Sequence, residues 1–163
     1  MSRHSEVNVK NNRRISGVAL DAADHQILTA LAGNARISMA DLGRLIGMSA
    51  QSAADRARRL EDLGVISGYT VKLDHVALGL ALGAYIRVRP AMGELPRVAA
   101  LLADIPEIVE CDRVTGDDCF IAKVFVARIE DLERVIDRLL PYAQTNTSII
   151  QSSPVWRRTP RLG

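Results

Sequence analysis

The sequence predicts an α+β protein in which three short helices precede a second part that alternates strands and helices. Three observations support this expectation. Residues 21–64 contain three apolar stripes at helical spacing, each preceded by an Asp or Ser that can cap a helix. Residues 65–74 carry β-branched residues on both sides of a Ser-Gly pair. From residue 80 onward, apolar runs of period two alternate with runs of helical period.

The composition is typical of a folded, water-soluble chain. Of the 163 residues, 48% are hydrophobic and 25% are charged, and no apolar run is long enough to cross a membrane. Residues 1–17 are polar and basic, without the apolar stretch of a secretory signal, so we expect a disordered arm and a cytoplasmic protein. Cys111 and Cys119 form no disulfide framework or zinc pattern, and no phosphate loop or hydrolase motif is present. We therefore expect no metal, no cofactor and no catalytic residue.

The charge is divided unevenly along the chain. Residues 1–73 carry ten lysines and arginines against seven acidic residues, a net charge of +3, whereas residues 74–163 carry eleven against twelve, a net charge of −1. This small asymmetry directs a polyanionic partner toward the N-terminal half.

Capping residues set the expected bounds of the first three helices. Asp21 is expected to begin the first helix and Gly33 to end it. Ser38 and Gly47 bound the second helix, and Ser49 begins the third after only a Gly-Met step, which is typical of a helix-turn-helix. The apolar stripes of the first two helices are Ile27, Leu28 and Leu31, and Leu42, Leu45 and Ile46.

The third helix combines a narrow stripe of small residues with a polar outer face. On a helical wheel centred on Ala53, Ala50, Ala57, Leu60 and Gly64 fall within about 60° of the centre. The opposite side carries residue types that contact phosphates and base edges. These residues are Gln51, Ser52, Asp55, Arg58, Arg59 and Asp62. The same charges also fit ordinary i,i+4 surface pairs, so the helix alone leaves the two interpretations even.

The segment after the third helix favours DNA binding. Residues 65–74 are expected to form a two-stranded ribbon with a turn at Ser67-Gly68, the wing of a winged helix-turn-helix, with Lys72 beside the DNA backbone. We expect the DNA-binding domain over residues 18–66 and the wing and connector over residues 67–79.

Residues 80–155 are expected to form a ferredoxin-like β-α-β-β-α-β sandwich, followed by a tail over residues 156–163. The expected strands cover residues 80–90, 107–116, 119–127 and 146–156, and the expected helices cover residues 94–105 and 130–140. Phe120, Ala122 and Val124 alternate with Ile121 and Phe125, so both faces of the sheet are expected to be apolar. Since both helices cover one face, the other face predicts a homodimer.

Over residues 20–155, the chain resembles the Lrp/AsnC (feast/famine) transcriptional regulators. The resemblance rests on LDAADHQILTAL, ARISMADLGRLIGMS, RARRLEDLGVISGYT with the following LD, VTGDDCF and the closing strand. It implies binding to double-stranded promoter DNA, homodimers that assemble into octamers, and control by an amino acid. The DNA-binding positions that it implies, together with Arg58 and the wing residue, are Ser49, Gln51, Ser52, Arg56, Arg58, Arg59 and Lys72. Arg56 lies at the edge of the buried stripe, so we rank it below Gln51, Ser52 and Arg59.

The resemblance also implies an effector site at the Gly-Asp turn between the second and third strands of the sandwich. Backbone N–H groups of such a turn can hold a carboxylate, and an Asp can hold an ammonium. The expected effector-binding residues are Thr115, Gly116, Asp117, Asp118, Cys119, Thr147, Ile149 and Gln151. The family pattern has Asp and Tyr where this chain has Cys119 and Phe120, so Asp118 is the carboxylate that can substitute. A plain hairpin turn with charged tips is the alternative.

Two other functions fit the same two-part plan. A sirohaem-decarboxylase-like enzyme would need cationic groups around an acidic tetrapyrrole and a proton donor, and no His lies within the sandwich. Arg87, Arg89 and Arg113 can bind carboxylates, but they fit a solvated sheet edge equally well. A small-molecule sensor without DNA binding is the third interpretation, and the arginines of the third helix count against it. The sequence therefore favours a DNA-binding regulator over an enzyme.

Overall fold

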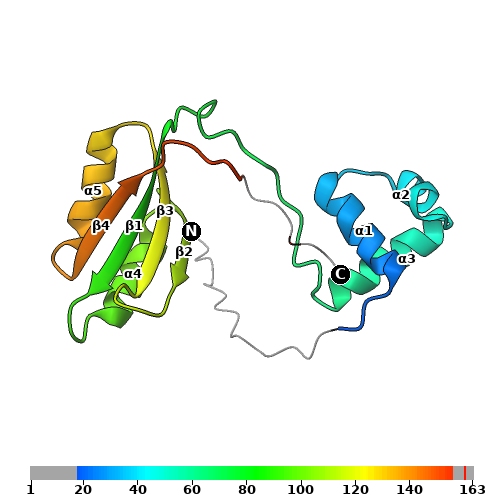
Figure 1. Cartoon of the computed structure of the whole chain (residues 1–163), viewed down its shortest axis with the longest axis horizontal. Coiled ribbons are helices and arrows are strands. Elements are labelled where there is room, and N and C mark those ends of the chain that lie inside the picture. Colours follow the sequence, from blue (N-terminus) through cyan, green and yellow to red (C-terminus); the bar gives the residue numbers. More distant parts are fainter. Residues whose placement is uncertain (1–17, 156–159, 161–163) are drawn as a thin grey trace, which may run out of the picture. The chain divides into compact units, whose positions relative to one another are not determined.

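The computed structural model describes residues 18–155 and residue 160, which form two compact units separated near residue 72 (Figure 1). The arm predicted over residues 1–17 and most of the tail predicted over residues 156–163 lie outside the described residues. The α+β class is confirmed, with helices alone in the first unit and a sheet with two helices in the second.

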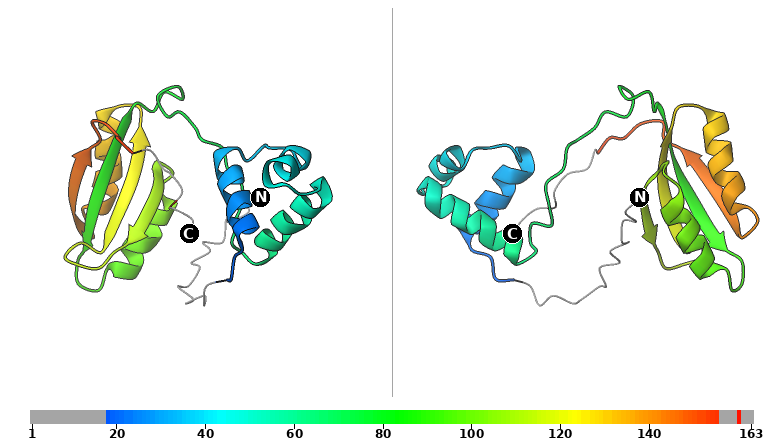
Figure 2. Two further views of the ribbon diagram at one scale, coloured as in Figure 1. Left: turned by 45° about the vertical axis from the view of Figure 1, so that its right-hand side comes forward. Right: turned by 180° about the vertical axis from the view of Figure 1, so that it is seen from behind.

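The first unit consists of α1 (Ala22–Gly33), α2 (Met39–Ile46) and α3 (Ala50–Asp62) (Figure 2). The three predicted caps are confirmed, because the side chains of Asp21, Ser38 and Ser49 each accept a hydrogen bond from the backbone N–H three residues on. Gly47 ends α2 in the left-handed conformation at φ 71°, as predicted. α2 and α3 are thus joined by the tight turn of a helix-turn-helix.

Small residues let α3 lie close to its neighbours. The buried apolar residues of this unit are Ile27, Leu31, Leu42, Ala53, Ala57 and Leu60. Gly43 of α2 faces the turn before α3, where a Cβ atom would lie 2.7 Å from the Met48 carbonyl oxygen and 3.0 Å from the Ser49 carbonyl carbon. Because both neighbours are backbone atoms, this approach requires glycine.

Several side-chain positions in this unit differ from the prediction. Leu45 is 66% exposed, because the buried side of α2 is centred on Leu42, Gly43 and Ile46 and Leu45 lies about 110° away from that centre. Ala50 is exposed in the first turn of α3, beyond the edge of the core.

The ends of α1 and α3 also differ. Gly33 remains helical, and the chain leaves α1 at Asn34, whose side-chain oxygen accepts a hydrogen bond from the Arg36 N–H at 3.0 Å. Gly64 is exposed and takes φ 69° after the end of α3, while the Val65 N–H donates to the Leu60 carbonyl at 2.9 Å. This is a left-handed helix end, not a packed stripe position.

The predicted wing is wrong. No strand is present over residues 65–74, which are an exposed chain segment apart from the half-buried Val65 and Ile66. The N–H groups of Val65 and Ile66 both donate to the Leu60 carbonyl, at 2.9 and 3.1 Å, so the first half of the expected ribbon closes the helix end instead of pairing with a strand. Lys72 therefore lies on an exposed segment without a ribbon.

The second unit has the predicted β-α-β-β-α-β order. Its elements are β1 (Leu82–Pro90), α4 (Leu95–Asp104), β2 (Ile108–Arg113), β3 (Phe120–Val126), α5 (Ile129–Leu139) and β4 (Ala143–Ile149). The strands form an antiparallel sheet in the order β2-β3-β1-β4, and α4 and α5 cover one face of it (Figures 1 and 2). β4 begins and ends nearer the N-terminus than the predicted strand over residues 146–156. Its first residues, 143–145, pair with residues 90–88 of β1, and because Gln144 and Thr145 are polar, they show no apolar alternation that could have predicted a strand there.

The helix-covered face forms the larger core, as predicted. The alternating residues of β3, Phe120 to Val126, are buried there, and so are the inward residues of both helices. The buried helix residues are Val98, Leu102, Leu132, Val135 and Leu139.

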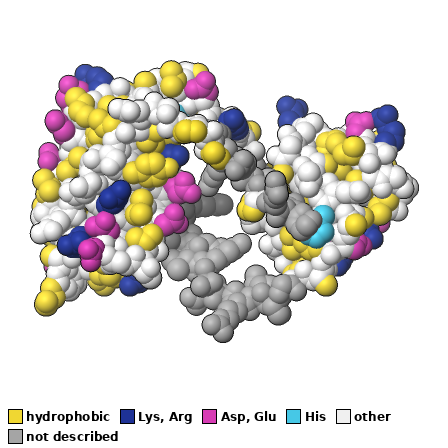
Figure 3. All heavy atoms as spheres, viewed as in Figure 1, with side chains coloured by type: hydrophobic (Ala, Val, Ile, Leu, Met, Phe, Trp, Pro, Cys, Tyr) yellow, Lys and Arg dark blue, Asp and Glu magenta, His cyan; other side chains and the backbone are white. Residues whose placement is uncertain are grey.

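The open face of the sheet carries both charged and apolar side chains (Figure 3), whereas the sequence predicted an apolar face. The register of the ladder places charged and apolar side chains of β1, β2 and β3 together on it: Tyr85, Arg87, Arg89, Glu110, Asp112, Ile121, Lys123 and Phe125. His75, from the connector, stacks on Phe125 with 3.7 Å between the ring centroids. Charged positions on β1 and β2 thus interrupt the apolar surface that was expected to bind another subunit.

Candidate nucleic-acid interface

The exposed side of α3 begins with a polar first turn. Ser49, Gln51 and Ser52 are exposed, and the hydroxyl oxygens of Ser49 and Ser52 lie 2.9 Å apart. The Gln51 amide donates to Asp55 Oδ1 at 3.0 Å, and Arg58 Nη1 lies 3.4 Å from the same oxygen. Exposed amide, hydroxyl and guanidinium groups of this kind contact base edges and phosphates.

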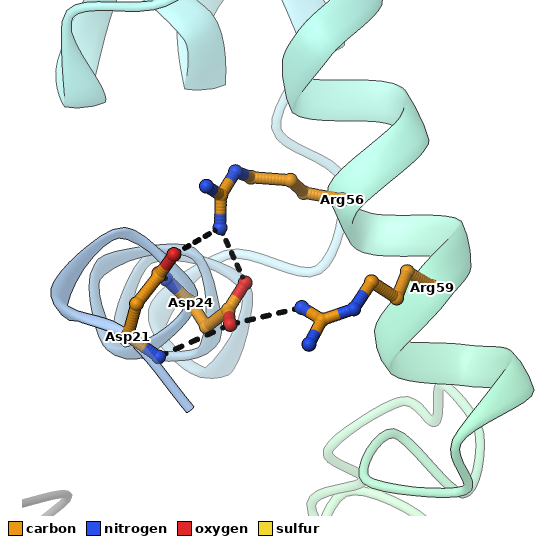
Figure 4. Close-up of polar contacts among 4 residues, drawn as sticks. All are labelled: Asp21, Asp24, Arg56 and Arg59. Atoms are coloured by element: carbon orange, nitrogen blue, oxygen red, sulfur yellow. Dashed lines mark hydrogen bonds and ion pairs between the residues drawn. The ribbon is translucent and has the colours of Figure 1, made fainter. Parts of the chain in front are cut away.

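The three arginines of α3 differ in what they contact, and Figure 4 shows two of them, Arg56 and Arg59, beside the aspartates at the start of α1. Arg56 Nη1 lies 2.7 Å from Asp21 Oδ2 and 2.9 Å from Asp24 Oδ1, and Arg59 Nη1 lies 3.0 Å from Asp24 Oδ2. The Arg56 and Arg59 side chains are 31% and 48% exposed, whereas that of Arg58 is 68% exposed. Two arginines thus join α3 to the start of α1, and Arg58 extends into solvent.

Asp24 is the centre of this network. Its side chain is 1% exposed, and Oδ2 also accepts a hydrogen bond from the Asp21 N–H at 3.2 Å, which completes a reciprocal capping box. Both carboxylate oxygens therefore have charged or backbone donors. A buried carboxylate needs such partners, because burial without them is costly.

The network shifts the pKa values of its members. Burial would raise the pKa of the Asp24 carboxyl, but the hydrogen bonds from the Asp21 N–H, Arg59 and Arg56 outweigh it and hold the pKa below its usual value. The Asp24 N–H and then Arg56 lower the pKa of Asp21. Hydrogen bonds to Asp21 and Asp24 raise the pKa of Arg56.

Sequence reasoning missed the role of Asp24. The available signal was its position three residues before Ile27 and seven before Leu31, on the buried stripe of α1. An acidic residue on a buried stripe indicates a cationic partner from another element. Arg56, at the edge of the stripe of α3, was ranked below Gln51, Ser52 and Arg59 for DNA contact, and its position beside Asp24 fits that ranking. Arg59, which was ranked above it, lies beside the same carboxylate.

In the second unit, the predicted effector turn is tied to β1. The Cys119 N–H donates to the Val88 carbonyl at 3.0 Å, and Arg89 Nε donates to the Asp117 carbonyl at 2.8 Å. Arg89 Nη2 also lies 3.6 Å from Asp117 Oδ2 and 4.0 Å from Asp118 Oδ1. Gly116 takes φ 115° within this turn.

A cleft of about 370 Å³ lies beside the turn, and its lining residues are Arg87, Arg89, Asp118, Gln144, Thr145 and Asn146. Of the predicted effector residues, Asp118 lines this cleft, the rest of the turn lies beside it, and those of the last strand lie away from it. Thr147 and Ile149 pair with Ile86 and Ala84, whose side chains face the helices, and Gln151 lies beyond the end of β4 that is far from Gln144. Arg87 and Arg89 were considered as carboxylate-binding residues only for the enzyme alternative and not for the effector site, although their spacing of two residues on one strand places them on one face.

Across residues 18–155 and 160, no group of three His, Cys, Asp or Glu side chains could hold a metal ion, and Cys111 and Cys119 are free thiols. None of the helices in the same residues has the length and apolar character needed to span a membrane.

Comparison with known proteins matches both units to one family. The AsnC-type helix-turn-helix domain matches residues 20–61, and the Lrp/AsnC ligand binding domain matches residues 83–160. An uncharacterized HTH-type transcriptional regulator of Bacillus subtilis, YezC, is 35% identical over 82% of this chain and 95% of its own length. The proline dehydrogenase transcriptional activator of Rhodobacter capsulatus is 31% identical over 88% of this chain and 97% of its own length.

The fold matches a solved structure of the same kind. The structure of LrpC from Bacillus subtilis aligns with a TM-score of 0.81 and 32% identity, covering 86% of this chain and all of that one. The agreement extends over both units of the chain, as the sequence matches do.

Proposed function

The chain belongs to the Lrp/AsnC family of helix-turn-helix transcriptional regulators, and from this premise we propose that α3 is the helix that binds specific DNA sequences. The observation that carries the proposal is the exposed first turn of α3, with Gln51 and Ser52 directed away from the core while Asp24 holds the helix against α1 through two of its arginines. A helix-turn-helix places the start of its second helix in the major groove.

In this proposal, different side chains of α3 contact the bases and the phosphates. The Gln51 amide carries a donor and an acceptor, the pair of groups that matches the N6 and N7 edge of adenine. Ser49 and Ser52 offer hydroxyls to phosphates or bases, and Arg58 offers the most exposed guanidinium of α3 to a phosphate. Gln51 and Arg58 both contact Asp55 in the free protein, so DNA binding exchanges those contacts for contacts with DNA.

Arg56 and Arg59 act as positioning residues in this proposal. Both share the buried Asp24 carboxylate, which neutralises much of their charge and fixes the angle of α3 against α1. Rigid placement of the helix matters because base contacts need side chains held at a defined position. Lys72, on its exposed segment, is proposed to add a phosphate contact.

We propose that a homodimer, with further assembly, presents two such helices to two half-sites. The partly apolar open face of the sheet supports this proposal through Tyr85, Ile121 and Phe125, and so do the exposed Tyr69, Val71 and Leu73 of the segment after α3. An effector bound to the second unit would act through its different affinity for two states of the assembly. Because the relatives are named as transcriptional regulators, we propose a regulator and not an enzyme.

The test is a fluorescence anisotropy titration of the purified chain with DNA from its own upstream region and with a scrambled duplex, at two salt concentrations. We expect tighter binding to the upstream DNA and weaker binding at the higher salt. Gln51→Ala should reduce the preference by about five- to 150-fold, since a good bidentate base contact contributes about 1–3 kcal/mol. Gln26→Ala, an exposed glutamine of α1, is the matched control and should bind like the wild type. Equal affinity for both duplexes would contradict the proposal.

A further inference from the structure

The cleft of the second unit carries a defined set of charges. Its charged lining residues are Arg87, Arg89 and Asp118, and the side-chain amides of Gln144 and Asn146 lie among them. Its volume, about 370 Å³, lies in the range of small-molecule sites. The two guanidinium groups and the single carboxylate give the cleft two positive charges and one negative charge.

The two arginines are placed to bind separate acid groups. Arg87 and Arg89 are alternate residues of β1 on the open face, so their Cα atoms are separated by about 7 Å and each guanidinium can take a carboxylate of its own. Opposite them, the ladder pairs Arg87 with Asn146 and Arg89 with Gln144, which puts an amide beside each guanidinium. Each arginine is thus accompanied by its own neutral hydrogen-bonding group.

The two guanidinium groups also differ in how they are held. Arg89 is oriented by the Asp117 carbonyl at 2.8 Å, and its distances to the Asp117 and Asp118 carboxylates, 3.6 and 4.0 Å, are longer than a good hydrogen bond. The guanidinium of Arg87 forms no hydrogen bond or ion pair with the residues that the structure describes. Both groups therefore keep donors for a bound anion.

Asp118 supplies the opposite charge. Its side chain is 33% exposed and lines the same cleft, with Oδ1 4.0 Å from Arg89 Nη2. That separation leaves the carboxylate able to accept hydrogen bonds from an ammonium group. The cleft thus contains partners for two anionic groups and one cationic group.

We propose that this cleft binds an α-amino acid with an acidic side chain, such as glutamate. Such a molecule carries two carboxylates and one ammonium, which match Arg87, Arg89 and Asp118 charge for charge. A neutral amino acid would leave one guanidinium without its anion, and a basic one would set a second cation against it. The inference deepens the proposed function, because it assumes that the second unit binds an effector and names the effector's class.

The experiment is isothermal titration calorimetry of the full chain with L-glutamate, L-glutamine and glutarate. Glutamine keeps the shape of glutamate without the second charge, and glutarate keeps both acid groups without the ammonium. We expect both to bind at least tenfold more weakly than glutamate. Arg87→Gln should weaken glutamate binding at least tenfold, and Arg113→Gln, an exposed arginine of β2 outside the cleft, should leave it unchanged.

Asp118→Asn tests the ammonium contact independently. Removing this carboxylate should weaken glutamate binding and strengthen glutarate binding, since the second ligand has no ammonium and is repelled by Asp118. If Asp118 had only a structural role, its replacement would change the affinities for glutamate and glutarate in the same direction. Circular dichroism of each variant checks that the fold is retained.

Three results would overturn the inference: glutamine binding as tightly as glutamate, Arg87→Gln binding glutamate like the wild type, or no glutamate binding by the wild type. The DNA titration with the upstream duplex gives a result that is independent of all three. Specific DNA binding without glutamate binding therefore rejects this inference alone, and glutamate binding without specific DNA binding rejects the proposed recognition role of α3 alone.

Discussion

The two units hold arginine–aspartate clusters of opposite character. In the helical unit, the Asp24 carboxylate is 1% exposed and lies within 3.0 Å of Arg56 and Arg59. In the sheet unit, Asp117 is 95% exposed and lies 3.6 Å from Arg89. Removing one partner from a pair of charges that is buried away from water is costly to a fold, whereas loosely paired exposed charges contribute little to stability and remain available to a ligand. This contrast agrees with the proposals that the first cluster positions α3 and that the second binds a ligand.

Replacing the central carboxylate of each cluster should give the largest contrast. Asp24→Ala removes both ion pairs and half of the capping box of α1, so we expect the helical unit to lose about 2–4 kcal/mol of its free energy of unfolding. Asp118→Ala should change the stability of the sheet unit by less than about 0.5 kcal/mol. Urea denaturation followed by circular dichroism measures both. Equal losses would remove the distinction between the clusters.

Acid should also lower the stability of the helical unit, because it protonates the carboxylates of the first cluster. The folded-state pKa values of Asp21 and Asp24 lie below their usual values, so their contribution to stability is complete above the unfolded-state pKa, about 4, and is lost as the pH falls toward the folded-state values. Thermal melts of the helical unit between pH 6 and pH 2.5 should therefore show a decline that begins near pH 4. Asp24→Asn should reduce the slope of that decline, and an unchanged slope would contradict the account.

Two glycines extend the comparison to backbone packing. A Cβ at Gly43 would meet backbone atoms at 2.7 Å, whereas one at Gly83 would meet the Phe125 ring at 2.9 Å, which can move. We expect Gly43→Ala to cost about 1–3 kcal/mol and to disturb the turn before α3, and Gly83→Ala to cost less. Gly33→Ala, with no atom within 4 Å, is the control and should be neutral or stabilising. Melting temperatures of the three variants decide the order.

The smallest expected effect concerns Arg58. Its side chain is 68% exposed and lies 3.4 Å from Asp55, so Arg58→Ala should leave stability unchanged while removing one phosphate contact. The slope of log affinity against log salt concentration should then fall by about one. An unchanged slope would place Arg58 away from the DNA backbone.

The sequence predicted the elements of this fold better than it predicted the contacts of its charges. Caps at Asp21, Ser38 and Ser49 and alternation along β3 are local signals, and all were confirmed. The predicted wing was wrong because the N–H groups of Val65 and Ile66 bond to the end of α3. β-propensity does not take account of this competition between closing a helix and forming a strand.

The charge clusters depend on contacts between elements. Asp24 precedes Arg56 by 32 residues, and Arg89 precedes Asp117 by 28, so neither pairing is visible in a local pattern. The expected effector residues of the last strand lie away from the cleft for a related reason, since β4 begins at Ala143 and its register decides which face each residue occupies. A shift of register by one residue exchanges the two faces.

The most direct test of the central claim measures stability and DNA affinity together for Arg56→Ala and Arg58→Ala. The account predicts that Arg56→Ala lowers the free energy of unfolding of the helical unit, and that Arg58→Ala lowers affinity for the upstream DNA while the free energy of unfolding stays at the wild-type value. If Arg56→Ala instead kept full stability and lost DNA affinity, the Asp24 cluster would not be what holds α3 in place, and Arg56 would be a direct DNA contact.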